Sequence, residues 1–329
     1  LLLVSDELTS VVESQVSEVI KEEKIRSSIP TFQGVVDEIS KEVRQQYEDN
    51  PYPRWKNTRL ESKPFSIKRM VKTLNLRVSA SDIIGCETPE VLIAGCGTGQ
   101  HSIQTASSFK NSNVLAVDLS LSSLAYAKRR TQELGISNIE YMQADILNLD
   151  QLNCKFDVIE SIGVLHHMND PMAGWKVLME CLKPGGLMKI ALYSQLARRD
   201  IVEMRREIKD LNICPNAVEM KAFRQKLLNS DQARHNKLLS MRDFYSLSEF
   251  RDLLFHTQEH RFTILEIQES LEGLGLVFCG LQDGPLIKAF KSVNTESDAL
   301  YDLKKWHEFE RNNPEAFIGM YEFWYQKVI

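Results

Sequence analysis

The stretch that decides the fold spans residues 91–100 and reads Val91-Leu92-Ile93-Ala94-Gly95-Cys96-Gly97-Thr98-Gly99-Gln100. An apolar run typical of a buried strand leads into a glycine-rich turn, and a helical pattern follows. Glycine is needed where the backbone turns sharply or where a ligand contacts the main chain. The first turn of the following helix offers free N–H groups and a partial positive charge to an anionic group. Taken alone, such a turn also fits a purely structural role.

Strand and helix patterns alternate between residues 89 and 194. Apolar runs occupy residues 91–94, 113–117, 139–142, 156–161 and 187–193, and helical patterns occupy 100–109, 121–134 and 172–182. This alternation predicts right-handed β-α-β units and a parallel sheet.

Acidic residues follow the second and third of these runs. Asp118 lies twenty-one residues after Gly97, where a carboxylate accepts hydrogen bonds from the ribose hydroxyls of a nucleoside. Asp145 and Ile146 follow the third run and are placed to contact an adenine edge. A nucleoside at this position fits either NAD or S-adenosylmethionine. The spacing favours the second, because Gln100 stands where a dinucleotide fingerprint has its third small residue.

This ordered set of motifs, which ends with Leu182-Lys183-Pro184-Gly185-Gly186, resembles the class I S-adenosylmethionine-dependent methyltransferases over about residues 89–194. The resemblance implies an α/β fold with a Rossmann-like, seven-stranded, mostly parallel sheet, and it implies S-adenosylmethionine as cofactor without a metal. By the same resemblance, the cofactor-binding residues are Gly95, Cys96, Gly97, Gly99, Asp118, Leu119, Asp145, Ile146 and Ser161.

The segments on both sides resemble a narrower group. Residues 46–55, and residues 252–256 with 258–263, resemble bacterial methyltransferases that carry N-terminal tetratricopeptide repeats. The repeats are absent here, and residues 1–5 look like a cut into a longer chain.

Four histidines are candidates for the chemistry. His166 and His167 follow the fourth strand, at the sheet edge where ligands bind, so one of them faces the acceptor or both cap the next element. His260 is the second choice for a catalytic group. His256 is a candidate for acceptor binding, with helix capping or core packing as the alternative. A zinc motif is absent, because Thr257 follows His256.

The cluster of Tyr47, Tyr52, Arg54 and Trp55 has two interpretations. It either packs the N-terminal helix onto the sheet or covers the cofactor, with Tyr52 and Arg54 at the substrate. By contrast, acidic residues interleave with the basic residues around Arg198 and Arg205, so we expect that face to lie in solvent.

These patterns divide the chain into four parts. We expect an N-terminal helical segment and lid in residues 1–60, the cofactor-binding core in 61–194, a helical insertion that caps the substrate in 195–260, and a C-terminal part in 261–329 that completes the core. Leu8, Val12, Val16 and Val19 share a helical spacing. Thr263 and Glu266 form a capping box before a helix, and residues 276–281 and 320–328 predict two further strands around a helix at 300–310.

Composition narrows the class of protein. The 329 residues are 43% apolar and 26% charged, with a formal charge of −5, which fits a globular domain and disfavours nucleic acid as partner. The six cysteines are scattered and fit a reducing cytoplasm. The sequence lacks an apolar run of about 20 residues, so no membrane span is expected. The sequence does not decide whether the protein forms a homo-oligomer.

The resemblance implies an enzyme that transfers a methyl group by in-line displacement to an unidentified small-molecule or protein acceptor. A general base is needed only where the acceptor must lose a proton. The alternative is a non-catalytic scaffold that binds the cofactor. Ile93 favours it, since many class I members carry Asp or Glu there to help hold the methionine ammonium group.

Overall fold

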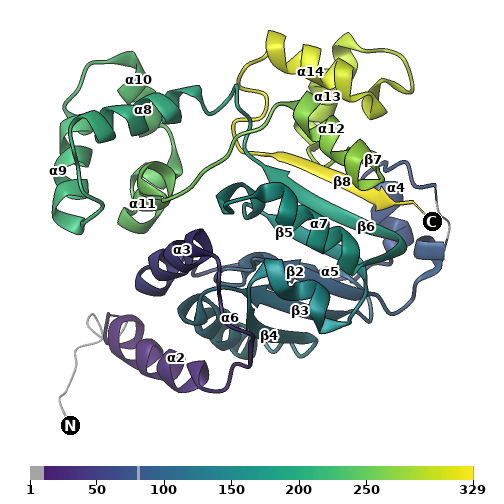
Figure 1. Ribbon diagram of the computed structural model, residues 1–329, viewed down its shortest axis with the longest axis horizontal. Coiled ribbons are helices and arrows are strands. Elements are labelled where there is room, and N and C mark those ends of the chain that lie inside the picture. The colour runs from purple at the N-terminus through teal and green to yellow at the C-terminus, as the bar shows by residue number, and fades with distance from the viewer. Residues whose placement is uncertain (1–10, 80–81, 329) are drawn as a thin grey trace.

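The fold is built around one mixed sheet, seen in the computed structural model, which describes residues 11–79 and 82–328 (Figure 1). The strand order is β1-β4-β3-β2-β5-β6-β8-β7. The strands are β1 (Thr31–Phe32), β2 (Glu90–Ala94), β3 (Asn113–Asp118), β4 (Ile139–Ala144), β5 (Phe156–Ile162), β6 (Leu182–Leu192), β7 (Leu276–Leu281) and β8 (Tyr321–Lys327). Pairing is parallel from β1 to β6, and β8 runs antiparallel to both β6 and β7. The α/β class and the mostly parallel sheet are therefore confirmed.

The expected count of seven strands is wrong by one. The additional strand is β1, two residues long, within a segment that the sequence assigned to helices. It extends the sheet beside β4, where the Gln143 N–H donates to the Pro30 carbonyl oxygen and the Thr31 hydroxyl donates to the Gln143 side chain. A two-residue strand is too short to leave an alternating pattern in the sequence.

Helices cover both faces of the sheet. Residues of α4 (Ile67–Thr73), α5 (Gln100–Ser108) and α6 (Leu121–Glu133) share one buried cluster with one face of the strands. Residues of α7 (Pro171–Cys181), α12 (Ile264–Leu274), α13 (Gly284–Val293) and α14 (Leu303–Asn312) share the cluster on the other face. Short 3-10 segments are η2 (Asp82–Gly85), η3 (Ile146–Leu152), η4 (Leu165–His167) and η6 (Ala299–Tyr301). The expected capping box is present at the start of α12.

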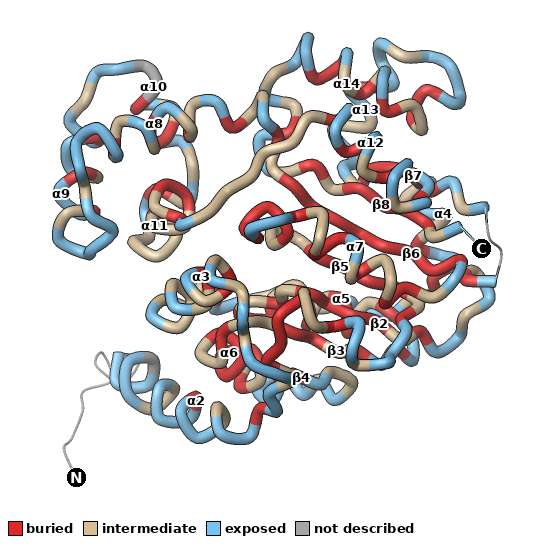
Figure 2. The backbone as a smooth tube through the Cα atoms, in the orientation of Figure 1, coloured by how far each residue is buried: buried red, intermediate tan, exposed pale blue. Residues whose placement is uncertain are grey.

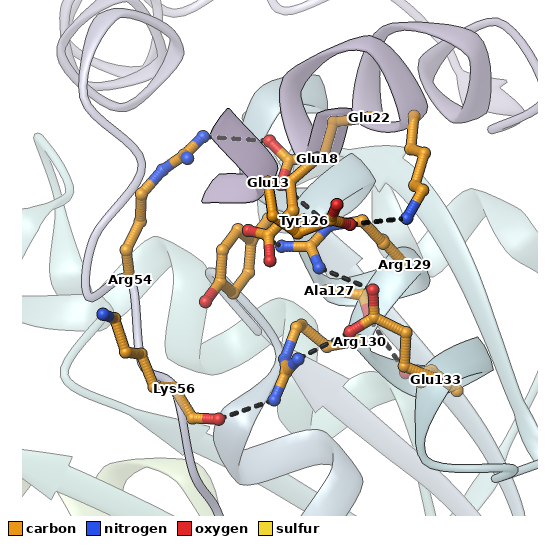
Figure 3. Close-up of polar contacts among 12 residues, drawn as sticks. Glu13, Glu18, Glu22, Arg54, Lys56, Tyr126, Ala127, Arg129, Arg130 and Glu133 are labelled. Carbon is orange, nitrogen blue, oxygen red and sulfur yellow. Dashed lines mark hydrogen bonds and ion pairs between the residues drawn. The ribbon is translucent and has the colours of Figure 1, made fainter. Parts of the chain in front are cut away.

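The N-terminal segment contains a π-helical turn, η1 (Glu13–Ser17), and the helices α2 (Glu18–Arg26) and α3 (Glu38–Asp49). Leu8, the first residue of the expected helical pattern, lies outside the described residues, as do residues 1–5. Arg129 of α6 ties α2 to the core, because its guanidinium contacts Glu18, Glu22 and Glu133 at 2.7–3.0 Å (Figure 3). Glu48 of α3 accepts the backbone N–H of Leu121 at the start of α6, 2.6 Å away.

Residues 195–260 hold the helices α8 (Arg199–Asp210), α9 (Ala217–Leu228), α10 (Ala233–Leu239) and α11 (Leu247–Phe255), with the short η5 (Arg242–Phe244). Their buried apolar side chains form a cluster separate from those of the sheet. The four helices stand beyond the carboxyl end of β6 (Figure 1). Figure 2 shows buried backbone concentrated in the strands, whereas α8–α11 expose much of their outer surface.

Candidate active site

A cavity of about 270 Å³ lies at the carboxyl ends of β2, β3, β4 and β5. Its walls come from the glycine-rich turn, from the ends of β3 and β4, from the segment after β5, and from α3 with the segment that follows it. Ligands bind at this edge in open α/β sheets because the strand order reverses there. The strand order β4-β3-β2-β5 places that reversal at β2, directly below the turn.

The glycine-rich turn fits a ligand against its backbone. Gly97 has φ +52°, and a Cβ added there would enter the space between the turn and the Tyr52 carbonyl oxygen, 3.4 Å away. Gly95 has another role, because its Cβ would lie 2.3 Å from the Val164 side chain. Gly99 does not line the cavity, and its Cβ would lie 2.5 Å from Ala127 of α6. Gly99 therefore permits close helix packing, whereas Gly97 leaves room for a ligand.

Asp118 lines the cavity and also holds the turn. One carboxylate oxygen accepts the Gly97 N–H at 2.8 Å, and the other accepts the Ser120 N–H at 2.9 Å. Burial raises the pKa of this carboxyl group, and the two backbone donors oppose the rise. The remaining lone pairs are available to hydroxyl donors of a ligand.

Asp145 and Ile146 line the cavity beyond β4, and Leu119 and Cys96 also line it. The Asp145 carboxylate accepts the Leu147 N–H at 3.0 Å, which fixes it at the start of η3. Ser161, by contrast, is fully buried within β5 and is not among the cavity residues, so the structure does not place it at the ligand. The side chain of Ser161 points to the opposite face of the sheet from that of Glu160, because neighbouring residues of a strand alternate.

The segment after α3 covers the turn. Thr98 donates its hydroxyl to the Pro53 carbonyl oxygen at 2.5 Å, and the Trp55 indole N–H donates to the Thr98 carbonyl oxygen at 3.0 Å. Tyr52 and Pro53 line the cavity, as does Tyr47 of α3. We call residues 52–55 the covering segment.

Arg54 does not take the substrate-binding position that the sequence suggested. It is not among the cavity residues, and its guanidinium donates to Glu22 of α2 at 2.9 Å and lies 5.3 Å from the Tyr126 ring centroid (Figure 3). Tyr52 and Pro53 line the cavity, whereas Arg54 faces α2. Arg54 fastens the covering segment to the N-terminal helix.

Of the four candidate histidines, His167 is the one that lines the cavity. Its Nδ1 lies 2.6 Å from the Gln258 carbonyl oxygen, which can only accept, so Nδ1 carries the proton. The other ring nitrogen, Nε2, is therefore left with a free lone pair. Burial is the main cause that lowers the pKa of His167 to about 4, so the ring is neutral at pH 7.

His256 lies behind His167. The two rings stack with their centroids 3.6 Å apart, and His256 is not among the cavity residues. Its Nδ1 accepts the Gln258 N–H at 3.2 Å, so Nε2 carries the proton and donates to the Tyr47 hydroxyl at 3.2 Å. Residue Gln258 thus fixes the tautomers of both rings, through its C=O for one and its N–H for the other.

The two remaining histidines lie outside the cavity. His166 is fully buried beside Tyr193, and neither of its ring nitrogens has a hydrogen-bond partner among the described residues. His260 donates its backbone N–H to the His166 carbonyl oxygen at 2.7 Å, and its ring contacts the Gln258 side chain. Both support the loop that holds His167. His256 and His260 also do not share a helix, because α11 ends at Phe255.

The two flanking segments, residues 46–55 and 252–263, meet here in space. The Tyr47 hydroxyl donates to Asp252 of α11 at 2.7 Å, although 205 residues separate them. Burial raises the pKa of Asp252 to about 6. The narrower resemblance to repeat-containing methyltransferases stays a prediction, but its two segments form one contact beside the cavity.

The expected basic face is only partly in solvent, because Arg199, Arg206 and Lys209 are exposed whereas Arg198 and Arg205 turn inward. The Arg198 guanidinium donates to Glu259 at 2.6 Å, and Arg205 donates to the same oxygen at 2.9 Å. The side chain of Arg198 is 8% exposed and that of Glu259 is 1% exposed. The interpretation from charge interleaving was wrong because it considered near neighbours in sequence, whereas the compensating carboxylate comes from residue 259.

Sequence reasoning missed His101, Val164 and Met168, which also line the cavity. His101 occupies the first turn of α5, directly after the glycine-rich turn. This position could have identified it as a cavity residue from the sequence. Among the described residues that line the cavity, none is lysine or arginine. A pyrophosphate would therefore find no side-chain cation here, whereas an uncharged nucleoside fits the two carboxylates. The residues present fit S-adenosylmethionine.

Comparison with known proteins agrees with this geometry. Residues 91–186 match the family described as a methyltransferase domain. Over these residues the chain is thus similar to methyltransferase domains. Its fold is similar to that of PKMT2 from Rickettsia typhi in complex with AdoHcy, with a TM-score of 0.52 and 20% identity, over 80% of this chain and 54% of that one.

Two curated relatives are similar in sequence. The protein syc1184_c of Synechococcus sp. is 31% identical over 253 residues, which are 71% of this chain and 59% of the relative. Phosphoethanolamine N-methyltransferase 1 of Arabidopsis thaliana is 31% identical over 120 residues, which are 36% of this chain and 24% of the relative. The chain thus spans less than two thirds of the length of these relatives.

The described residues show neither a metal-binding cluster nor a membrane-spanning helix. Within residues 11–79 and 82–328, no group of three or more His, Cys, Asp or Glu side chains could hold a metal ion. Of the helices in the described part of the chain, none combines the length and the apolarity that a bilayer crossing requires.

Proposed function

We propose that this protein transfers the methyl group of S-adenosylmethionine to a small-molecule or protein acceptor. The observation that carries the proposal is the cavity itself. It combines the open backbone at Gly97 with the carboxylates of Asp118 and Asp145 at neighbouring strand ends, and it has no lysine or arginine among its described lining residues. The AdoHcy bound to the similarly folded PKMT2 supports the same ligand class.

The residues would divide the binding between them. Asp118 would accept the ribose hydroxyls, Asp145 and Ile146 would contact the adenine, and the backbone around Gly97 would contact the middle of the ligand. When bound, S-adenosylmethionine supplies a methyl group that is already activated by its sulfonium. The faces of Tyr47 and Tyr52 suit a nearby cation, because aromatic rings attract positive charge.

His167 is the group we assign to proton transfer. His167 lines the cavity, and the Gln258 carbonyl holds its ring in the tautomer that leaves the Nε2 lone pair free. It would accept a proton from an O–H or N–H acceptor as that group attacks. Orientation of the two reactants by a rigid pocket can supply up to about 7–11 kcal/mol, so catalysis does not depend on His167 alone.

We place the acceptor between the cavity and the helices α8–α11. Support comes from Gln258, which follows α11 and holds His167, and from Asp252 of α11, which holds Tyr47. The acceptor side of the pocket would therefore be shaped by residues 195–260, with Tyr52 contributing from the covering segment. Loops and insertions around a rigid scaffold commonly carry specificity.

Binding and turnover test the proposal separately. In calorimetric titrations the protein should bind S-adenosylmethionine and S-adenosylhomocysteine and should not bind NAD. Incubation with S-adenosylmethionine labelled on the methyl group and with fractionated cell extract should label an acceptor fraction, and His167→Gln should slow this labelling. NAD binding without S-adenosylmethionine binding would refute the assignment, and binding without any labelling would favour the scaffold.

A further inference from the structure

One end of the proposed ligand lacks an obvious partner. Asp145 follows β4 and Asp118 follows β3, so a nucleoside held by both would extend along the strand order toward β2 and β5. The amino-acid end would then reach the cavity wall formed by Gly95, His101 and Ile162. An ammonium group there needs acceptors and is best stabilised by a negative charge nearby. The two carboxylates that line the cavity stand at the opposite end.

A buried carboxylate lies directly behind this wall. Glu160 of β5 is 4% exposed, and its Oε2 lies 2.8 Å from His101 Nε2. Thr105 of α5 donates its hydroxyl to the same oxygen at 2.8 Å. Although burial alone would raise the pKa of Glu160, the hydrogen bonds from His101 and Thr105 and the charge of the nearby Lys189 lower it, so the group is ionised.

His101 connects this charge to the cavity. The ring lines the cofactor cavity on one side and a second cavity of about 570 Å³ on the other, which Glu160 also lines. Because a carboxylate only accepts hydrogen bonds, His101 Nε2 carries a proton toward Glu160. In the neutral ring, Nδ1 is then an acceptor, and Glu160 increases the negative potential at that atom.

We propose that His101, backed by Glu160, binds the ammonium group at the amino-acid end of S-adenosylmethionine. This assignment rests on the proposed function. Register supports it, because Glu160 pairs with Ile93 across β5 and β2 and so lies level with the residue two positions before the first glycine of the turn. The imidazole extends the reach of the carboxylate from β5 to the cavity. The competing role is structural, with the pair only fastening α5 to β5.

Ligands that differ at this end separate the two roles. We would titrate the parent, His101→Phe and Glu160→Gln with S-adenosylmethionine, with its decarboxylated form, which keeps the amine, and with 5′-methylthioadenosine, which has no amino-acid end. His101→Phe should weaken the first two by about 10- to 100-fold, as expected for a lost hydrogen bond to a charged group, and should leave the third within about 2-fold. Glu160→Gln should shift the same two ligands in the same direction.

Asp118→Asn is the matched control, because a change at the ribose should weaken all three ligands together. An equal loss for all three ligands in His101→Phe would overturn the proposal and favour the structural role. A loss for S-adenosylmethionine but not for the decarboxylated form would assign His101 to the carboxylate instead. Failure of the parent to bind any of the three would count against the proposed function, which distinguishes it from failure at His101 alone. Ligand-free melting curves confirm that each variant is folded.

Discussion

Loss of the proton-binding site at His167 should flatten the dependence of stability on pH. The folded protein holds the pKa of this ring at about 4, against about 6.5 in an unfolded chain. Between these values the unfolded chain binds more protons, so the free energy of unfolding falls as the pH falls below 6.5. His166 and His256 are shifted in the same direction, mainly by burial, and they steepen the fall in the parent.

The size of the effect follows from the shift. One pKa unit corresponds to about 1.4 kcal/mol, so His167 accounts for a loss of about 1.4 kcal/mol between pH 8 and pH 5.5. The full loss, reached below pH 4, is about 3.4 kcal/mol on the same scale. Arg198 and Arg205 add to the shift by repelling a protonated ring, and Glu259 opposes it.

The assay is urea unfolding of the parent and of His167→Gln at several pH values from 8 to 5.5. The variant starts less stable, because it loses ring packing, but its stability should fall by about 1.4 kcal/mol less over this range. Leu165→Val is the control, since it removes a buried methylene from the same 3-10 segment without removing a titrating group. Parallel pH profiles for the parent and His167→Gln would refute the burial of a neutral ring.

Three further changes test other parts of the structure. Asp118→Asn should weaken S-adenosylhomocysteine binding by about 10- to 100-fold in calorimetry, and it should also lower the melting temperature, because the carboxylate accepts the Gly97 and Ser120 N–H groups. Gly97→Val should abolish binding, since its side chain would enter the ligand space at φ +52°, and a ligand-free melting curve would separate this from misfolding. Arg129→Met should lower the free energy of unfolding in urea titrations, because it removes the buried guanidinium that pairs with Glu18, Glu22 and Glu133 and leaves Glu22 with Arg54 alone; an unchanged midpoint would contradict this role.

The sheet was the part that sequence patterns predicted well. Each apolar run between 91 and 193 became a strand, because a parallel strand buried on both faces leaves a continuous apolar stretch. The same patterns predicted the final two strands. They missed β1, which is too short to show a period, and α13, whose Asp283 cap and following proline were not considered.

The sequence predicted those residues of the candidate site that belong to local motifs. The turn from Gly95 to Gly97, Asp118 and Asp145 lie around one cavity because each follows a strand of the same sheet. Side chains from distant segments were harder to place. Whether Arg54 faces the cavity or Glu22, and whether Arg198 faces solvent or Glu259, depends on contacts between segments far apart in the chain. No local pattern carries that information.

The covering segment has a consequence for rates. It closes over the glycine-rich turn through the Thr98–Pro53 and Trp55–Thr98 hydrogen bonds, while Arg54 and Glu22 hold its outer side. A nucleoside beneath it would leave only after these contacts opened. We therefore expect dissociation of S-adenosylhomocysteine to be limited by this opening rather than by diffusion, so that the first turnover is faster than those that follow.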